Sequence, residues 1–270
     1  MLTTANLSLL VLGQAELNLL YTLLGLIAGF VVGLTSFGIG SIVTPILILL
    51  FKVPPILAVG SAIIFGVVTK GIASFQHREQ HTVDRQAVTF LLLGSVPAAA
   101  IGSGIVFMLR ARDFLGANHW IERQIGFVLL LLGLCILAKD NPWVKRLRES
   151  EWGDFGKKLR LGAIGSVVGF IFSTTSIGSG SLSVLLLSLF MPLAESRVVG
   201  TAIVYGFVVS AFSSFWHIAA GNVEWALVGF LLLGSVPGVL LGSKLALRAP
   251  RRLLRTCFSL AAIGAGWKLI

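Results

Sequence analysis

The sequence predicts an all-α polytopic membrane protein built from two inverted-topology repeats, each a broken, re-entrant helical hairpin followed by three transmembrane helices. Three observations support this prediction: the apolar composition, an internal duplication, and a glycine-rich interruption at the same place in each half. Hydrophobic residues make up 56% of the chain and charged residues only 12%, whereas a soluble chain carries about 25% charged residues. The chain is therefore expected in a lipid bilayer, where each crossing needs roughly 20 residues of helix.

The duplication has a fixed offset. The sequence Leu-Leu-Leu-Gly-Ser-Val-Pro occurs at residues 91–97 and again at 231–237, so the offset is 231 − 91 = 140 residues. The same offset pairs Gly25 with Gly165 and His77 with His217, and it needs no insertion between residues 25 and 103. Duplicated membrane chains are typical of secondary transporters, which hold their substrate where the two halves meet.

Each repeat opens with an interrupted apolar segment. Residues 1–18 are expected to form an interfacial lead-in, after which residues 19–34 are apolar, residues 35–41 (Thr-Ser-Phe-Gly-Ile-Gly-Ser) break the pattern, and residues 42–51 resume it. In the second repeat, residues 159–172 lead into a break at 173–181, followed by residues 182–190. Glycine disfavours helix interiors and Ser/Thr favour helix starts. The short second arms predict a hairpin that turns at mid-depth, although hairpins in which both arms span the membrane remain an alternative.

Three spanning helices follow each hairpin, at about 55–76, 86–109 and 121–138, and again at 196–217, 223–247 and 251–268. The first repeat thus covers residues 19–138, a basic cytoplasmic linker covers 139–158, and the second repeat covers 159–270. Because three crossings are an odd number, the second repeat must be inverted relative to the first. A cytoplasmic linker then places both termini outside, in line with the preference of basic loops for the cytoplasm.

Glycines and cysteines inside the apolar runs are expected to be structural. Two stripes of small residues, Gly25-x-x-x-Gly29-x-x-x-Gly33 and Gly234-x-x-x-Gly238-x-x-x-Gly242, predict close helix contacts. The two cysteines, Cys135 and Cys257, form neither a disulfide framework nor a metal motif and are expected to be buried. No cofactor or metal is predicted. The net charge of +10 lies in the loops between apolar runs, so nucleic acid is not an expected partner.

The two breaks are the candidate binding site. Non-helical backbone at membrane depth is tolerated only when it is buried in protein or lines a wet cavity. Each break begins a half-helix, whose free N–H groups can bind an anion. The hydroxyls and glycines expected to bind substrate are Thr35, Ser36, Gly38, Gly40 and Ser41 in the first break, and Thr175, Ser176, Gly178, Ser179, Gly180 and Ser181 in the second. The alternative is a pair of tight turns that only cap their own helices.

Two basic side chains near the spans have two interpretations each. Lys70 lies well inside an apolar span and is aligned with Ser210 in the second repeat. It either balances the charge of an anionic substrate or extends its stem so that the ammonium reaches the interface. His77 and His217 end equivalent helices, where interfacial anchoring is expected, and proton coupling is the alternative.

These residues resemble a known family. Residues 38–45 (Gly-Ile-Gly-Ser-Ile-Val-Thr-Pro), the later Ala-Val-Gly-Ser-Ala at 58–62 with Val-Gly-Thr-Ala at 199–202, and the repeated Gly-Ser-Val-Pro resemble the TauE/SafE family of sulfite and organosulfonate exporters over most of the chain. The resemblance departs where Ser41 and Ser179 interrupt the glycines. It implies export of a small sulfur-containing oxyanion, by alternating access, across the bacterial plasma (inner) membrane.

Two other functions remain open from the sequence. An anion channel could share the same site without alternating access. A membrane enzyme acting on lipid phosphate would need clustered His, Asp or Arg at one interface, and no such cluster recurs, so an enzyme is not expected. The expected partners are a small anionic substrate and the lipid bilayer. The oligomeric state is open, with a homodimer as one alternative.

Overall fold

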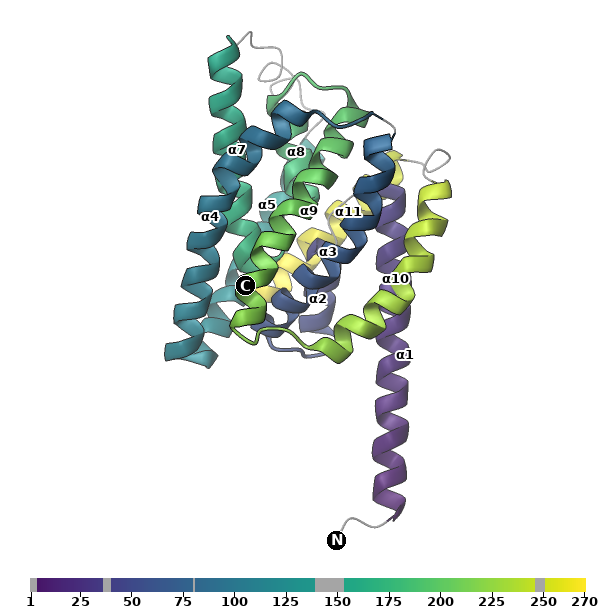
Figure 1. Cartoon of the computed structure of the whole chain (residues 1–270). Coiled ribbons are helices and arrows are strands. Elements are labelled where there is room, and N and C mark those ends of the chain that lie inside the picture. The colour runs from purple at the N-terminus through teal and green to yellow at the C-terminus, as the bar shows by residue number, and fades with distance from the viewer. Residues whose placement is uncertain (1–3, 36–39, 80, 139–152, 246–250) are drawn as a thin grey trace.

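The chain folds into a helical bundle that matches most of the predicted elements. The computed structural model describes residues 4–35, 40–79, 81–138, 153–245 and 251–270, and the regular structure there is entirely α-helical (Figure 1). The helices are α1 (Thr4–Thr35), α2 (Gly40–Leu49), α3 (Pro55–Glu79), α4 (Arg85–Arg112), α5 (Phe114–Ala138), α7 (Asp154–Thr175), α8 (Ser181–Phe190), α9 (Glu195–Ala219), α10 (Trp225–Leu245) and α11 (Arg251–Leu269).

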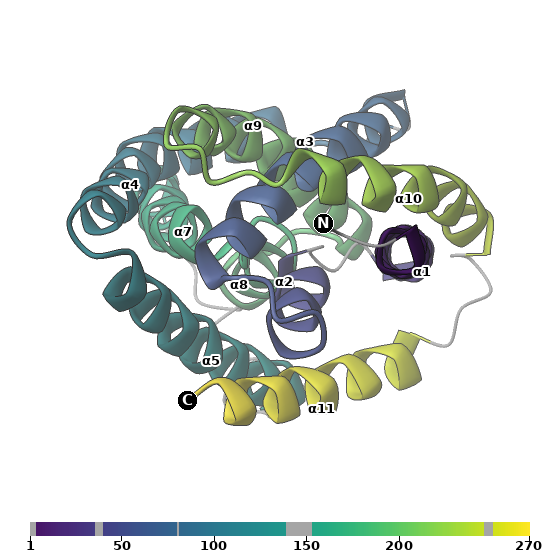
Figure 2. The same cartoon turned by 90° about the horizontal axis from the view of Figure 1, so that it is seen from below.

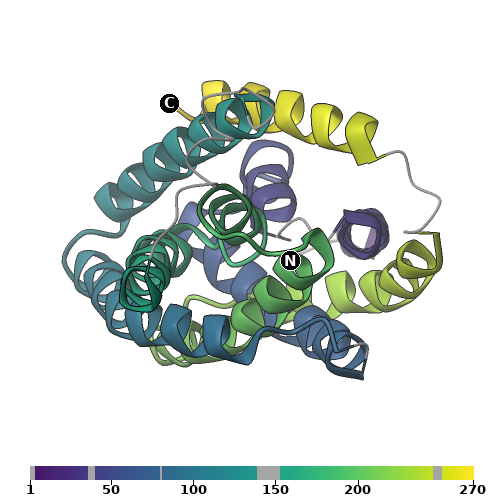
Figure 3. The same ribbon diagram turned by 90° about the horizontal axis from the view of Figure 1, so that it is seen from above.

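Six of these helices, within the described residues, hold a segment long and apolar enough to cross a membrane. This agrees with a polytopic, all-helical membrane protein. The predicted transmembrane helix at α11 is not among the six, because Arg251, Arg252, Arg255 and Lys268 leave it no sufficiently uncharged window. In Figures 2 and 3, α11 runs beside α5, itself one of the six, along one edge of the bundle.

Two predicted boundaries differ from the structure. The sequence predicts a long connection between a helix ending at 109 and one starting at 121, but only Asp113 separates α4 from α5. Its carboxylate accepts from the backbone N–H of Leu115 at 3.0 Å, and its carbonyl accepts from Ala117 at 3.0 Å. These bonds start α5 seven residues before the apolar run, so polar residues there are helical. At the N-terminus, α1 passes residue 18 without interruption, so the lead-in and the first hairpin arm form one helix.

Both predicted helix breaks are present. The first lies within the predicted stretch from Thr35 to Ser41, because α1 ends at Thr35 and α2 already begins at Gly40. The second begins later than predicted, because α7 continues through Ser173 and Thr174 to Thr175. The hydroxyls of Ser173, Thr174 and Thr175 donate to carbonyls three or four residues earlier, at 2.6–3.2 Å. Such bonds keep Ser and Thr within a helix, and Ser176, with a left-handed φ of 61°, ends it.

The glycine stripes pack helices together, as predicted. A Cβ built on Gly25 would overlap the backbone carbonyl of Leu231, and one built on Gly234 would overlap that of Thr22, so α1 and α10 touch through their backbones. The equivalent contact recurs 140 residues away, where a Cβ on Gly165 of α7 would overlap the carbonyl of Leu91 of α4. The same close packing therefore occurs twice, once in each of two helix pairs.

The short helices α2 and α8 lie at the centre of the bundle. Figures 2 and 3 show them surrounded by α1 with α10, α4 with α7, α3 with α9, and α5 with α11. Cys135 of α5 and Cys257 of α11 are exposed on the outside, so the expectation of buried thiols is wrong. Gly133 is the residue that meets α11, and a residue two positions further points about 200° around the helix.

Candidate functional site

The second break is fully buried at the centre of the bundle. Every residue from Ser173 to Ser181 is buried, and Gly178 takes a positive φ of 133°, which L side chains rarely adopt. Among the described residues, no side chain caps the start of α8 at Gly180. The first N–H groups of a helix lack partners within it and carry partial positive charge. The second break therefore points an uncapped helix start into the protein interior.

The start of α2 packs directly on this break. A Cβ on Gly40 would overlap the backbone carbonyl of Ser176, so only glycine permits this approach. The hydroxyls of Thr44 and Ser176 lie 2.6 Å apart and share a hydrogen bond. The hydroxyl of Ser181, the first residue of α8, donates to that of Ser41 at 3.3 Å. The two half-helices thus begin side by side, as expected for two breaks that meet.

Lys70 reaches this junction from α3. It is 7% exposed, and its ammonium donates to the hydroxyl of Ser179 in the second break and to that of Ser210 at 3.3 Å. Its Nζ also lies 5.1 Å from the centre of the Phe172 ring. The side chain does not extend to the interface, so the snorkelling interpretation is wrong. Glycine at position 206 allows this approach, because a Cβ there would overlap the carbonyl of Ser179 and lie 3.3 Å from Lys70 Cδ.

The junction combines features that suit a small anion. Among the described residues, Lys70 is the only buried Lys, Arg, Asp or Glu. A buried cation without a carboxylate partner is costly in a membrane protein and is commonly functional. Here one positive charge, several hydroxyl donors and an uncapped helix start converge, with glycines that permit close backbone approach. This is the chemistry of an oxyanion site.

The structure brings most of the predicted residues together. Gly40, Ser41, Lys70 and the predicted residues of the second break meet at the junction, whereas Ser36, Gly38 and the Thr35 side chain lie outside the described residues. The sequence reasoning missed Thr44, Phe172, Gly206 and Ser210. One signal was available for Ser210, because it aligns with Lys70 at the 140-residue offset.

His217 is not an interfacial anchor. It is 1% exposed, and its Nε2 lies 2.9 Å from the carbonyl oxygen of Ser173, just before the second break. The prediction of interfacial anchoring is therefore wrong for this residue. The His77 side chain lies outside the described residues.

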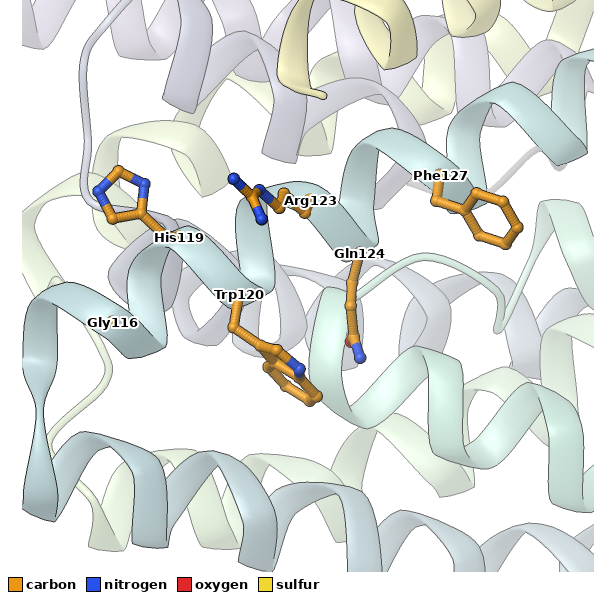
Figure 4. A pocket seen from close by; sticks show the side chains of 6 residues that line it. All are labelled: Gly116, His119, Trp120, Arg123, Gln124 and Phe127. Atoms are coloured by element: carbon orange, nitrogen blue, oxygen red, sulfur yellow. The ribbon is translucent and has the colours of Figure 1, made fainter.

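A separate groove runs along the first half of α5. It has a volume of about 490 Å³ and is lined by Gly116, His119, Trp120, Arg123, Gln124 and Phe127 (Figure 4). None of these residues was predicted to bind substrate, and none contributes to the junction. The groove is thus distinct from the site at the helix breaks.

A helical membrane bundle with broken helices meeting at its centre is the architecture of secondary transporters. The sequence model of the family described as Sulfite exporter TauE/SafE matches residues 21–269, and the chain belongs to this family. It is similar to three proteins of Bacillus subtilis (strain 168). The probable membrane transporter protein YjnA is 34% identical over 254 residues, covering 92% of this chain and 98% of the relative.

Two further relatives are more distant. The probable membrane transporter protein YunE is 29% identical over 247 residues, covering 85% of this chain and 87% of the relative. The probable membrane transporter protein YdhB is 25% identical over 253 residues, covering 92% and 96%. No solved structure matches. The chain is accordingly a multi-pass membrane transporter and not an enzyme.

Proposed function

We propose that the chain exports a small sulfur-containing oxyanion, such as sulfite or an organosulfonate, which binds at the junction of the two helix breaks. The observation that carries the proposal is the Lys70 ammonium, buried without a carboxylate and bonded to Ser179 of the second break. For an anion that crosses alone, an inside-negative membrane potential favours this direction by about 2.3 kcal/mol per charge per 100 mV.

Alternating access between two inverted repeats is the proposed mechanism. Three features support the inversion: the 140-residue duplication, the matching contacts of α1 with α10 and of α7 with α4, and the opposite directions of α1 and α7 in Figure 1. Lys70 with Ser210, and Ser41 with Ser181, are also pairs of counterparts in contact. A two-fold relation between the halves accounts for such pairs, since a residue on the axis meets its own equivalent.

Uptake by proteoliposomes tests the proposal. The purified protein is reconstituted and offered labelled sulfite, sulfate, thiosulfate, sulfoacetate, taurine and lactate. A carrier gives saturable uptake and accelerated exchange against unlabelled substrate on the opposite side. Uptake that never saturates, with currents far above carrier turnover, favours an anion channel instead. Failure to move any of these anions would contradict the proposed function.

The proposed orientation places the linker at 139–158 in the cytoplasm and both termini outside. In a background with Cys135→Ser and Cys257→Ser, we expect a membrane-impermeant thiol reagent to label Arg112→Cys, at the exposed end of α4, in intact cells. We expect Ser150→Cys, in the linker, to react only after the membrane is opened. Labelling of Ser150→Cys in intact cells would reverse the orientation.

The hydroxyl of Ser176 is expected to contribute moderately to anion affinity. A hydrogen bond to a charged group is worth about 1.5–3 kcal/mol, so Ser176→Ala should weaken binding by roughly tenfold or somewhat more. Thr44→Val is the matched control, because it removes the other hydroxyl of the same 2.6 Å pair. Isothermal titration with the transported anion measures both. Equal affinity in wild type and Ser176→Ala would mean that this hydroxyl does not bind the anion and only links α2 to α7.

A further inference from the structure

A second group of buried polar side chains lies between α4 and α9. Within the described residues, five buried side-chain polar atoms find no hydrogen-bond partner. Four of them are Ser103 Oγ on α4 and Ser213 Oγ, Trp216 Nε1 and His217 Nδ1 on α9. The fifth is the hydroxyl of Tyr205, two turns earlier on α9. An unpaired polar group inside a protein costs about 1–3 kcal/mol, so four in one region need an explanation.

The packing of α4 against α9 brings these four residues into one region. α4 and α9 pack together and run in the same direction (Figure 1). Arg110 of α4 donates to the carbonyl of Ala220. Gly102 of α4 and His217 of α9 both meet Ser173 of α7, so the neighbouring Ser103 lies near the level of His217. Trp216 and His217 follow Ser213 by one helical turn, on the same face.

α7 closes the third side of this group. A Cβ on Gly102, the neighbour of Ser103, would overlap the hydroxyl of Ser173. His217 contacts the carbonyl oxygen of the same Ser173 through Nε2 at 2.9 Å. The group therefore lies against the last turns of α7, beside the second break. Along α9 its members lie three to seven residues, or about 5–10 Å, from the level of Ser210 and Lys70.

The chemistry of these atoms favours an anion once His217 is protonated. A carbonyl oxygen can only accept, so the bond to Ser173 assigns the ring hydrogen of neutral His217 to Nε2 and leaves Nδ1 as an acceptor. The indole N–H of Trp216 can only donate, and the two serine hydroxyls can rotate to donate. Protonation turns Nδ1 into a fourth donor and adds a positive charge.

The surrounding charges link protonation to anion binding. α3 brings Lys70 toward α9, and α4 brings Arg110, whose guanidinium also donates to Asn222. α8 has no charged residue, the charges of α7 lie in its first two turns far from Thr175, and Glu224 follows α9 in the next connection. Because two cations flank His217 along α9, a third positive charge is unfavourable there unless an anion accompanies it.

We propose that His217, Ser103, Ser213 and Trp216 form a second anion subsite, which takes up one proton at His217 Nδ1 together with the anion and releases both in the same direction. The inference rests on the proposed function and adds a proton as the coupled ion, so a singly charged anion crosses without net charge and leaves down its own concentration gradient rather than being driven by the membrane potential. The proton comes from water on one side of the membrane and returns to water on the other, with no net change in the protein.

The experiment measures protons and anions together in proteoliposomes. Methanesulfonate is the probe, because it stays ionised near neutral pH and every proton that moves with it must be carried by the protein. With the potential clamped at zero, an inward methanesulfonate gradient should acidify the lumen of wild-type vesicles by about one proton per anion, read with a trapped pH dye. His217→Gln keeps a donor for the Ser173 carbonyl and should lose this acidification.

The matched control is His119→Gln, which removes an exposed histidine of α5 and should acidify like wild type. Wild-type anion uptake without acidification, or acidification retained in His217→Gln, would overturn the inference while leaving the proposed function intact. Absence of uptake of every sulfonate and of sulfite by wild type would overturn both. If His217→Gln does not fold, the number of protons that enter wild-type vesicles with each anion still tests the inference. Trp216→Phe should keep the ratio and weaken the apparent affinity.

Discussion

Gly40→Val is expected to abolish anion transport. The Cβ of any larger residue at position 40 would overlap the backbone carbonyl of Ser176. A backbone atom cannot move aside as a side-chain end can, so α2 must shift away from the second break. That shift also separates Thr44 from Ser176 and Ser41 from Ser181, the two hydroxyl pairs that join the half-helices. Uptake per molecule of reconstituted protein measures the effect.

Gly229→Val is the matched control, because a Cβ at position 229 of α10 meets no atom within 4 Å. It should transport like wild type. Size-exclusion chromatography in detergent separates loss of folding from loss of transport, and Gly40→Ala, which adds only the Cβ, tests whether that atom alone is sufficient. Normal uptake by a well-expressed Gly40→Val protein would mean that the breaks are only structural turns.

Replacing Lys70 by methionine is expected to weaken anion binding without destabilising the empty protein. The substitution keeps the apolar stem and deletes the charge. A buried charge carries a desolvation cost, so its replacement by an apolar side chain of similar size is often neutral or stabilising. Anion affinity should fall by at least about tenfold, because one charge-assisted hydrogen bond is worth roughly 1.5–3 kcal/mol.

Thermal-shift titration separates the two effects. A ligand at a hundred times its dissociation constant stabilises the folded state by about 2.7 kcal/mol, so the wild-type melting temperature should rise with added anion. Lys70→Met should melt at or above the wild-type temperature without anion and show a smaller rise with it. Lys158→Met, which removes a partly exposed lysine paired with Asp154 at 2.9 Å, should respond to anion like wild type. An unchanged anion response in Lys70→Met would assign Lys70 a purely structural role.

The positions of the helix breaks could be predicted because they depend on local chemistry. Glycine and hydroxyl residues at 35–41 and 173–181 interrupt apolar runs, and the glycine stripes at 25–33 and 234–242 match the four-residue spacing of a helix face. Both patterns span only a few neighbouring residues, so they can be recognised in one sequence without knowledge of the fold. The later end of α7 was missed because the hydroxyls of Ser173 to Thr175 bond to their own helix, which looks identical in sequence to a break.

The direction of long side chains could not be predicted in the same way. A lysine two turns inside a span can reach the interface or the centre, and the choice depends on where its neighbours leave room. For Lys70 that room comes from Gly206, 136 residues further along the chain. His217 likewise depends on a carbonyl of α7 that only the folded bundle brings within 2.9 Å. At Asp113 the difference from the prediction is local, because this one capping residue connects α4 to α5 where a longer connection was predicted.

The contact between Lys70 and Ser210 bears on how such a chain could arise from a half-length ancestor. If two identical half-length subunits associated, the positions of Lys70 and Ser210 would hold the same residue. Two lysines or two serines would then face each other. Two ammonium groups at that spacing repel each other, and two hydroxyls carry no charge. Duplication lets the two positions diverge, and a single cation at the centre of the bundle is an arrangement that two identical halves cannot encode.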